Sequence, residues 1–520
     1  MGIAVGIDLG TSNSVVAMVR DGQSVVLADE EGRTVHPSVV AFGYGHQVVV
    51  GHRARQQLAY APENTVFSAK RLIGRRFGSE EVERIRRMVG WGVAEGPNGD
   101  ARVRVQGKVY AVQEISAHVL AHMKRVAETA TGETVDAAVI TVPAYFNDMQ
   151  RQATRDAAQI AGLNCLRIIN EPTSAALAYG FGQGKRQHIA VYDLGGGTFD
   201  ISVLRLDDDL FEVISTSGDT FLGGDDFDMV IADHLVAEVK RTTGVDVSDS
   251  HAARTKLREA AERAKRALSQ VEAVAVKVPG LGKDKDGNAI GLQTRLDHHT
   301  VQQLVMPLIQ QSFVVTDEAL SLAGLTPAQI DQVLLVGGMT RFPLIRDAVG
   351  HYFGQEAGAH LNPDEVVALG AAIQAHNLTS FEEVPGAVLL DVTPQTLGIR
   401  TVGGFVESLI PRNTPIPTEA GKVFHTAHDN QHEVRIQVFQ GESRMATDNE
   451  LLGEFVLSGL RPAPRGEVQV RVTFAIDADG IVKVTAKDMD SGRAVDMLIE
   501  ASSNLSEDEI QDMKFDDLGF

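Results

Sequence analysis

Residues 1–380 alternate apolar runs of strand length with stretches in which apolar residues recur every three or four positions. Residues 137–142 and 333–336 are two of the predicted strands, and residues 257–268 place their apolar side chains on one face of a predicted helix. Strands and helices that alternate along a chain are typical of an α/β architecture in which helices cover the sheets. We therefore predict an α/β fold for this part of the chain.

After residue 391 the pattern changes to a strict alternation of apolar and polar residues, which indicates strands with one buried face. Residues 468–476 alternate in this way, and residues 481–487 do so after the turn sequence Asp477-Ala478-Asp479-Gly480. Two alternating runs around such a turn predict a β-hairpin. This region is therefore expected to be a separate all-β domain, an antiparallel sandwich.

The two patterns divide the chain into four predicted parts. These are an α/β region over 1–381, a linker over 382–391, a β-sandwich over 392–504 and a helical stub over 505–520. The linker carries four apolar residues in a row at 387–390, so we expect it to dock on a surface in at least one state. It can also be read as the first strand of the sandwich. The stub starts with Ser506 and Glu509, the spacing of a capping box.

Composition excludes several classes of function. A chain of 520 residues is too long for one hydrophobic core, because single cores stop growing at about 250–300 residues. The net charge of −21 repels phosphate backbones and argues against nucleic acid as a partner. One cysteine, Cys165, excludes an internal disulfide and a zinc–cysteine site. Without a basic leader or an apolar run of about 18 residues, we predict a cytoplasmic protein with no membrane partner.

The order apolar run, Asp, Leu, Gly occurs twice, at Asp8 to Gly10 and at Asp193 to Gly195. The repeat predicts two similar lobes, each of which offers one turn to a ligand between them. Backbone N–H groups of such turns can hold phosphates, while the aspartates face the accompanying metal. Neither a P-loop nor a dinucleotide-binding glycine motif is present. One turn alone is weak support, so the prediction depends on the pair.

Further residues are suited to bind the base and ribose of a nucleotide. The Gly337-Gly338 turn follows a predicted strand, and its missing side chains let a flat ring approach the backbone. On the predicted helix, Glu262, Lys265 and Ser269 are three and four positions apart and can together bind a ribose and a base edge. Arg266 lies beside them and can stack on the ring.

These motifs resemble the seventy-kilodalton heat-shock chaperones of the DnaK type, within the actin and sugar-kinase ATPase superfamily. The resemblance runs from Gly6 to about Glu509 and is carried by both Asp-Leu-Gly turns and by residues 140–146, 168–173 and 336–341. It implies a two-lobed, actin-like α/β ATPase domain followed by an all-β peptide-binding sandwich. It also implies an ATP-dependent chaperone that holds exposed apolar segments of unfolded proteins, with ATP binding and hydrolysis controlling the affinity through the linker.

The resemblance implies a role for each matching residue. For nucleotide binding these are Gly10, Thr11, Ser12, Asn13, Gly195, Gly196, Gly197, Thr198, Glu262, Lys265, Arg266, Ser269, Gly337, Gly338, Arg341 and Asp364. For hydrolysis they are Lys70, Glu171, Thr198, Asp200, Asp8 and Asp193. Asp8 and Asp193 are expected to hold Mg²⁺ largely through water, with K⁺ as a further candidate ion. Phosphoryl transfer depends on positioning and charge neutralisation, which a lysine and a metal supply.

The same resemblance implies partners and the residues that face them. Pro143 and Arg151 are expected to relay the nucleotide state, while Arg167, Asn170 and Asp391 contact a J-domain cochaperone and Leu389 and Leu390 form the docking linker. The expected peptide site is lined by Ile399, Thr401, Val402, Phe424, Ala427, Val434 and Ile436. A nucleotide-exchange factor and unfolded client polypeptides are the other expected partners.

Two other functions stay open at this point. A sugar-type small-molecule kinase would explain both glycine turns but not the sandwich or the linker. A non-catalytic, actin-fold interaction protein would not need Lys70, Glu171, Thr198 and Asp200, all of which are present. The chain also departs from the family pattern at Ala387, at Gln395-Thr396 and at Val402. With no helical lid beyond the stub, we expect fast peptide release and a specialised paralogue.

Overall fold

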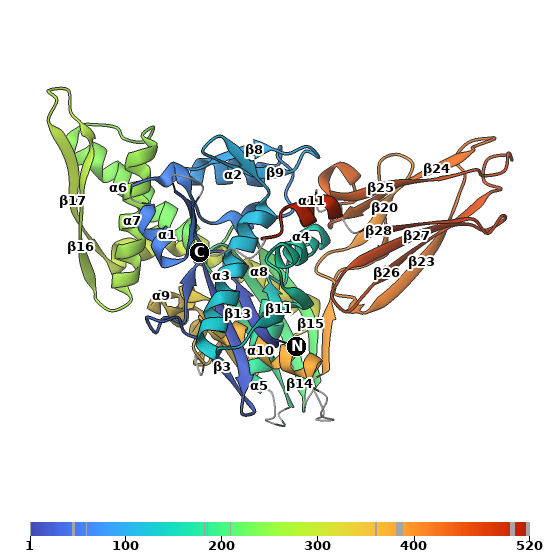
Figure 1. The fold of residues 1–520 in the computed structure, drawn as a ribbon, viewed down its shortest axis with the longest axis horizontal. Coiled ribbons are helices and arrows are strands. Elements are labelled where there is room, and N and C mark those ends of the chain that lie inside the picture. The colour runs from blue at the N-terminus through green and yellow to red at the C-terminus, as the bar shows by residue number, and fades with distance from the viewer. Residues whose placement is uncertain are drawn as a thin grey trace.

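The structure is a computed structural model (Figure 1). It describes the chain except residues 1, 44–46, 59, 181–183, 185, 209, 359–360, 381–387, 500–504 and 516–520, and it leaves out the side chains of 496–499. The predicted linker residues 382–387 therefore lie outside the described residues.

The first large sheet has the order β12, β11, β1, β2, β3, with the short strand β4 beside β2. We call this sheet and its surroundings lobe I. Its strands are β1 (Ile3–Leu9), β2 (Asn13–Arg20), β3 (Gln23–Val26), β4 (His36–Pro37), β11 (Val135–Val142) and β12 (Asn164–Asn170). Two smaller sheets belong to it, one of β5 (Val40–Phe42), β6 (Val48–Val50) and β7 (Thr65–Val66), the other of β8 (Gly92–Glu95), β9 (Ala101–Val105) and β10 (Lys108–Tyr110). Its helical elements are α1 (His52–Gln57), η2 (Pro62–Asn64), η3 (Ala69–Leu72), α2 (Glu80–Met88), α3 (Val112–Thr131) and α4 (Asp148–Ile160).

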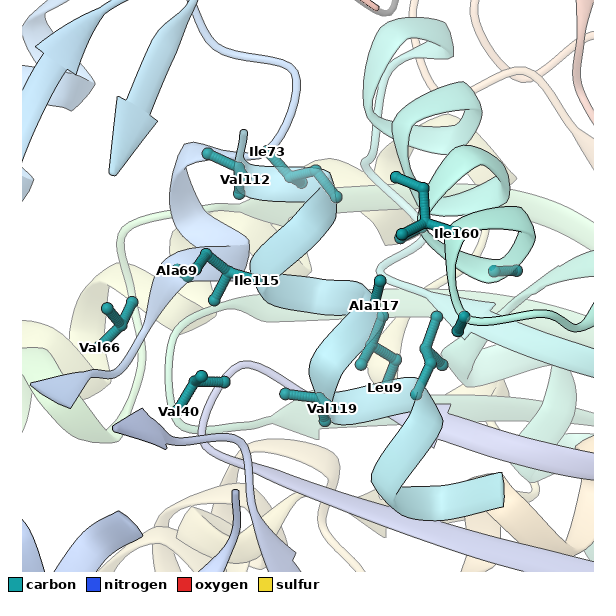
Figure 2. Packing of buried hydrophobic residues seen from close by; sticks show 14 of the residues in the cluster. Leu9, Val40, Val66, Ala69, Ile73, Val112, Ile115, Ala117, Val119 and Ile160 are labelled. Atoms are coloured by element: carbon teal, nitrogen blue, oxygen red, sulfur yellow. The ribbon is translucent and has the colours of Figure 1, made fainter. Parts of the chain in front are cut away.

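Helix α3 shows how burial decides the local structure in lobe I (Figure 2). It carries the β-branched residues Val112, Ile115 and Val119, which lower intrinsic helix propensity by a few tenths of a kcal/mol each. All three are buried in the lobe I core. Burying such a side chain contributes about 1.5–3 kcal/mol, so packing outweighs propensity and the segment remains helical.

The second large sheet has the order β18, β13, β14, β15, β19, β22, and it defines lobe II. Its strands are β13 (Arg186–Leu194), β14 (Phe199–Asp207), β15 (Leu210–Asp219), β18 (Gln332–Val336), β19 (Val388–Val392) and β22 (Pro415–Ile416). The hairpin of β16 (Ala273–Lys283) and β17 (Ala289–Asp297) projects from this lobe, away from the sandwich (Figure 1). The helical elements are α6 (Gly224–Thr243), α7 (His251–Leu268), α8 (His298–Ala323), η4 (Pro327–Gln329), η5 (Gly338–Arg341) and α9 (Pro343–Phe353). Helix α5 (Glu171–Gly180) begins directly after β12 and packs on the second sheet and on α10 (Val366–Thr379), which covers β1, β2 and β11 of lobe I.

The two large sheets repeat one arrangement, as the paired sequence motifs predict. Strand β1 pairs antiparallel with β2 and parallel with β11. Strand β13 pairs in the same way, antiparallel with β14 and parallel with β18. The two Asp-Leu-Gly sequences therefore end equivalent strands in equivalent sheets.

The C-terminal β region consists of two four-stranded antiparallel sheets, ordered β21, β20, β24, β25 and β23, β26, β27, β28. Its elements are β20 (Leu397–Arg400), β21 (Val406–Ile410), β23 (Thr418–His425), β24 (Glu433–Gln440), η6 (Ala446–Asp448), β25 (Glu450–Ser458), β26 (Gln469–Ile476), β27 (Val482–Asp488) and β28 (Ala494–Ile499). Alternate residues such as Val472, Phe474 and Val484 fill one shared core. The predicted hairpin is confirmed: β26 pairs with β27, and Asp477 Oδ1 accepts from the backbone N of Asp479 and Ile481, both at 2.9 Å.

The described part of the linker is a strand. Val388 to Leu390 pair parallel with β15 of lobe II, and Asp391 and Val392 then pair antiparallel with β22. Both readings of the sequence are thus partly correct, because these residues dock on the α/β region and also lead into the β region.

Helix α11 (Glu507–Asp512) carries the predicted capping box, in which the backbone N of Glu509 donates to Ser506 Oγ at 3.2 Å. It lies against α4 of lobe I (Figure 1), and Ile510 is buried in the lobe I core. Phe515 stacks on His118 of α3 with ring centroids 4.5 Å apart. The segment therefore packs on the α/β region rather than on the sandwich.

Candidate functional site

Two turns face each other between the lobes: turn 1 (residues 10–13), which joins β1 to β2, and turn 2 (residues 195–198), which joins β13 to β14. Their approach explains two of the glycines. A Cβ atom on Gly196 would collide with Ser12 Oγ, and one on Gly197 would lie 2.6 Å from Thr11 Cγ2. Any larger residue at either position would push the turns apart, so the glycines set the width of the cleft.

A cleft of about 570 Å³ lies between the turns. The predicted residues that line it come from both lobes and are Asp8, Gly10, Thr11, Ser12, Asn13, Glu171, Asp193, Gly195, Gly196, Thr198, Gly337, Gly338 and Asp364. Gly337 adopts a left-handed φ of 84°, and a Cβ atom there would lie 2.8 Å from Asp193 Oδ1. The third glycine turn therefore packs directly on the end of β13, as the sequence suggested for a close backbone approach.

Three carboxylates line this cleft, those of Asp8, Glu171 and Asp193, and the predicted residues Asp200 and Lys70 lie next to them without lining it. Lys70 Nζ donates to Glu171 Oε1 at 2.9 Å and also to the carbonyl oxygen of Leu9. Burial and the neighbouring Glu171 raise the pKa of Asp8 to about 7 and raise the pKa of Asp193 well above its usual value of 3.8. One ammonium does not neutralise this group of carboxylates, so their raised pKa values reflect the cost of ionising all of them without a further cation.

Two neighbouring residues fix the carboxylates. The Thr141 hydroxyl donates to Asp8 Oδ1 at 3.0 Å, and the backbone N of Tyr145 donates to Asp200 Oδ1 at 3.1 Å. Burial first, and Glu171 second, raise the pKa of Asp200 to about 7. Sequence reasoning missed Thr141 and Tyr145 as supporting residues, although both lie in the segment 140–146 that carries the family resemblance.

A divalent cation would supply the positive charge that lets these carboxylates ionise together. Among the described residues, no group of three or more His, Cys, Asp or Glu side chains is arranged to hold a metal directly. Mg²⁺ keeps several of its waters and is often held by one or two carboxylates plus substrate phosphates. Asp8 and Asp193, on opposite sides of the cleft, match that mode of binding through water, and K⁺ stays an untested expectation.

The residues predicted to bind adenosine are engaged elsewhere in this structure. Glu262 pairs with Arg55 of lobe I at 2.5 Å and with Arg266 at 2.8 Å. Lys265 is buried and pairs with Asp228 at 2.8 Å. Glu262 is therefore a bridge between the lobes as well as a candidate ligand contact.

The remaining predicted adenosine contacts lie at element ends. Ser269 follows the last residue of α7, and Arg341 at the end of η5 pairs with Asp364 at 2.7 Å. None of the residues predicted on α7 lines the cleft between the turns. Their role in binding a base or ribose stays a prediction.

The predicted relay residues form one chain of hydrogen bonds. Arg151 donates to Asn170 Oδ1 at 2.6 Å and to the carbonyl oxygen of Ala144, next to Pro143, at 3.3 Å. Asn170 Nδ2 donates to Asp391 Oδ2 at 2.7 Å. Burial raises the pKa of Asp391, which lies at the end of the linker strand. The path from lobe I to the linker is therefore continuous.

Lobe I also contacts the sandwich directly. Arg155 pairs with Asp479 at 2.6 Å, and Arg167 donates to the carbonyl oxygen of Ala478 at 3.2 Å. The backbone N of Val482 donates to Asp148 Oδ1 at 3.1 Å. Arg167, Asn170 and Asp391, the predicted cochaperone contacts, are thus used within the chain in this conformation.

The predicted peptide-site residues fall into two groups. Ile399 and Ile436 are buried in the sandwich core, whereas Val402 is 82% exposed at the β20–β21 turn. Phe405, on the same turn as Val402, is also exposed and forms a β-bridge with the exposed Met445; neither residue was predicted. Thr401, Phe424, Ala427 and Val434 are half-buried. The structure thus presents an apolar turn at the sandwich surface, and its role in binding peptide stays a prediction.

Two similar lobes around a cleft, joined by a docked strand to an antiparallel sandwich, define an actin-like ATPase fold with an attached β domain. A family model described as Hsp70 protein matches residues 4–518. The chain belongs to the Hsp70 family. Members of this family are ATPases and chaperones, and they bind ATP or ADP with Mg²⁺, client peptides and cochaperones. No helix among the described residues is long and apolar enough to span a bilayer.

Proposed function

We propose that this protein is an ATP-dependent chaperone whose β-sandwich holds exposed apolar segments of client proteins, with an affinity set by the nucleotide in the cleft. The observation that carries the proposal is strand β19. It completes the sheet that contains turn 2 and also pairs with β22, which leads into the sandwich. One short strand therefore belongs to both functional parts.

The cleft residues divide the work of hydrolysis. Lys70 places a positive charge beside Glu171, where it can offset charge on the transferred phosphoryl group. Glu171 and Asp200 would orient the attacking water. The carbonyl oxygen of Thr198 closes turn 2 by accepting from the backbone N of Gly195 at 3.1 Å. Asp8 and Asp193 would hold Mg²⁺, which would supply further charge neutralisation.

Strand pairing gives the cleft a route to the linker. Turn 2 leads directly into β14, which pairs with β15, and β15 pairs with β19. A change in turn 2 on loss of the γ-phosphate therefore reaches the linker across two adjacent strand pairs. Such coupling is reciprocal, so bound peptide must change nucleotide affinity or turnover. A J-domain cochaperone and a nucleotide-exchange factor are the proposed regulators of the cycle.

The test measures ATP turnover by the purified protein alone, with an apolar extended peptide, and with a J-domain cochaperone. Turnover that rises with either partner supports the chaperone function. Turnover that rises only with a sugar, together with a phosphorylated sugar product, supports the alternative of a small-molecule kinase. Absence of any turnover supports the alternative of a non-catalytic interaction protein.

A further inference from the structure

Lys70 and Arg71 are consecutive residues that point to opposite lobes. Both lie on η3 and both are buried, with exposed fractions of 6% and 5%. Lys70 reaches the hydrolytic carboxylate Glu171. Arg71 instead crosses the cleft to lobe II. The resemblance predicted a hydrolytic role for Lys70, whereas no role was predicted for Arg71, which stands next to it in the basic run at 70–76.

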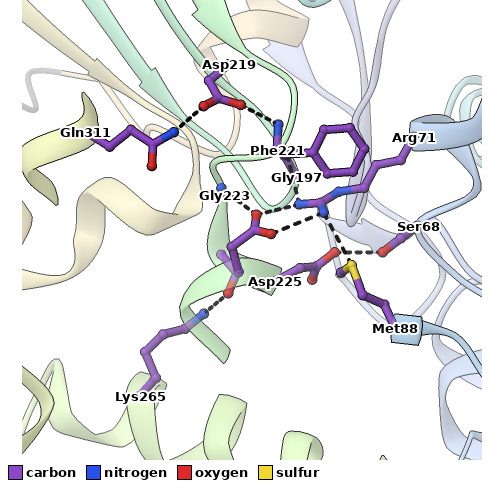
Figure 3. Close-up of polar contacts among 12 residues, drawn as sticks. Ser68, Arg71, Met88, Gly197, Asp219, Phe221, Gly223, Asp225, Lys265 and Gln311 are labelled. Carbon is purple, nitrogen blue, oxygen red and sulfur yellow. Dashed lines mark hydrogen bonds and ion pairs between the residues drawn. The ribbon is translucent and has the colours of Figure 1, made fainter. Parts of the chain in front are cut away.

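The Arg71 guanidinium contacts the backbone of turn 2 (Figure 3). Its Nη2 donates to the carbonyl oxygen of Gly197 at 2.8 Å and to Asp226 Oδ2 at 2.8 Å, while Nη1 lies 3.4 Å from Asp226 Oδ1. The guanidinium also lies over the ring of Phe221, 5.4 Å from its centroid. A forked contact of this kind fixes the orientation of both partners more strictly than a point charge does.

Asp226 ties this contact to the whole of turn 2. It accepts from the backbone N of Gly223 at 2.9 Å at the start of α6. The next two backbone N–H groups, of Gly224 and Asp225, donate to the carbonyl oxygens of Gly195 at 2.9 Å and of Gly196 at 2.8 Å. Turn 2 and the first turn of α6 are therefore one unit, and Arg71 binds that unit at two points.

A second contact holds η3 to the same unit. Ser68, which precedes η3, adopts a left-handed φ of 54°, and its hydroxyl donates to Asp225 Oδ2 at 2.7 Å. Ser68 and Arg71 flank the position from which Lys70 leaves the backbone. The backbone of Lys70 is thus fixed relative to lobe II, while its ammonium is fixed relative to the carbonyl oxygen of Leu9 in lobe I and to Glu171, which directly follows β12.

We propose that Arg71 is a positioning residue, which pins η3 to turn 2 when the lobes close and thereby places the Lys70 ammonium for hydrolysis. If the lobes close without this contact, η3, which carries Lys70, is free to shift relative to the phosphates of the nucleotide. The proposal rests on the proposed ATP hydrolysis. It adds that hydrolysis depends on a contact between the lobes that touches neither the substrate nor the metal.

The test compares single-turnover hydrolysis of bound ATP, and separately ATP affinity, in the full chain and its variants. Arg71→Met is expected to lower the hydrolysis rate roughly ten- to hundredfold, the scale of a misplacement of about 1 Å, with a much smaller change in affinity. Arg71→Lys keeps the positive charge but loses the forked contact, so its hydrolysis rate is expected to lie between those of the wild type and Arg71→Met. Arg84→Met is the matched control, because Arg84 is exposed and lies over the same Phe221 ring at 5.1 Å without contacting turn 2.

A double variant separates positioning from a purely structural role. Because Arg71 acts through Lys70, adding Arg71→Met to Lys70→Ala is expected to slow hydrolysis little further. An equal fold-loss in both backgrounds, or a loss of ATP affinity as large as the loss of rate, would overturn the proposal. If Arg71→Met does not fold, Asp226→Asn removes the same ion pair and carries the same expectations. If the wild-type protein does not hydrolyse ATP, the proposed function is refuted as well. If the wild type hydrolyses ATP and Arg71→Met does so at the same rate, only the positioning role is refuted.

Discussion

At the residue scale, the buried Lys70 is the single cation among the predicted catalytic residues. We expect Lys70→Ala to lower the hydrolysis rate about 100- to 1,000-fold, the usual effect of removing one electrostatic stabiliser from an active site. Nucleotide affinity is expected to change far less, because we expect the backbone of turns 1 and 2 to provide most of the phosphate contacts. Single-turnover hydrolysis and equilibrium nucleotide binding measure the two effects separately. The control is Lys285→Ala, an exposed lysine on the β16–β17 hairpin. A variant that hydrolyses ATP at the wild-type rate would exclude Lys70 from the reaction.

How much of the site the sequence predicts depends on the sequence distance between contacting residues. Turns 1 and 2 are local features, and their Asp-Leu-Gly order alone places them at equivalent strand ends. The contact between Arg71 and Asp226 spans 155 residues, and no local pattern marks either partner. The Arg55–Glu262 bridge spans 207 residues, and again no local pattern marks either partner. Contacts between the lobes depend on how the two lobes pack together, which a single sequence does not reveal.

At the element scale, β19 is the strand on which coupling depends, and its side chains differ in burial. Leu389 packs against apolar residues of lobe II and of α10, whereas Val388 is 53% exposed. Leu389 is half-buried, and a charge there would replace these apolar contacts without gaining a partner, which opposes docking of the strand. We expect Leu389→Asp to abolish stimulation of ATP turnover by peptide and Val388→Asp to retain most of it. Equal stimulation in both variants would show that docking of this strand does not carry the signal.

Features of the sandwich and of the C-terminal segment that depend on nearby residues could be predicted from the sequence alone. The hairpin of β26 and β27 and the capping box at Ser506 are set by residues within a few positions of each other. The sequence gives no sign that α11 packs on lobe I, because Ile510 is as well suited to any apolar surface. Its site of docking depends on α3 and α4, which are distant in the chain.

Helix α3 carries histidines that make lobe I sensitive to acid. Burial lowers the pKa of His118 to about 4, and burial together with His36 and Arg125 lowers that of His122 to about 3. His122 Nε2 lies 3.3 Å from His36 Nδ1, so protonating either ring opposes protonation of the other. His52 and Asp29 also face this cluster. These rings are neutral in the folded protein at neutral pH.

Because the folded pKa values of His118 and His122 lie below the unfolded value of about 6.5, the unfolded chain binds more protons as pH falls. The stabilising effect of the neutral rings is therefore complete above about pH 6.5 and is lost progressively below it. The expected loss in free energy of unfolding is about 2 kcal/mol per histidine at pH 5. Denaturant unfolding between pH 5 and 8 measures it. Below about pH 6.5, His122→Gln is expected to reduce the slope of the free energy of unfolding against pH by the amount that corresponds to about one proton. His432→Gln, an exposed control in the sandwich, is expected to leave this slope unchanged.

At the scale of the whole molecule, the structure shows the docked arrangement, in which the sandwich, the linker strand and lobe I contact one another. Several polar groups are buried where these parts meet. Asp148 at the start of α4 is 2% exposed and faces β27, and Glu450 of β25 accepts from Asn147 Nδ2 at 2.5 Å. Burial raises the pKa of Asp148 to about 8 and also raises that of Glu450. Docking is thus linked to proton binding.

The raised pKa of Asp148 determines whether docking strengthens or weakens as the pH changes. In an undocked molecule the carboxyl faces water and its pKa returns toward 3.8, so the docked state binds more protons between about pH 4 and 8. Docking is therefore expected to strengthen by up to about tenfold per pH unit as pH falls below about 8, and to be weakest above it. Nearby Arg151 lowers the Asp148 pKa and Asp477 raises it, but burial is the larger effect.

Hydrogen exchange of the β19 backbone amides, measured from pH 6.5 to 9 after correction for intrinsic rates, reports docking. In the wild type, protection of these amides is expected to fall as pH rises through 8. Asp148→Asn removes the charge but keeps an oxygen that can accept from Val482, so protection should stay high at all pH values in this range. Asp286→Asn, at the exposed turn between β16 and β17, should behave like the wild type. If Asp148→Asn retains the full pH dependence, the linkage belongs to Glu450 or Asp391 instead, and Glu450→Gln then separates those two groups.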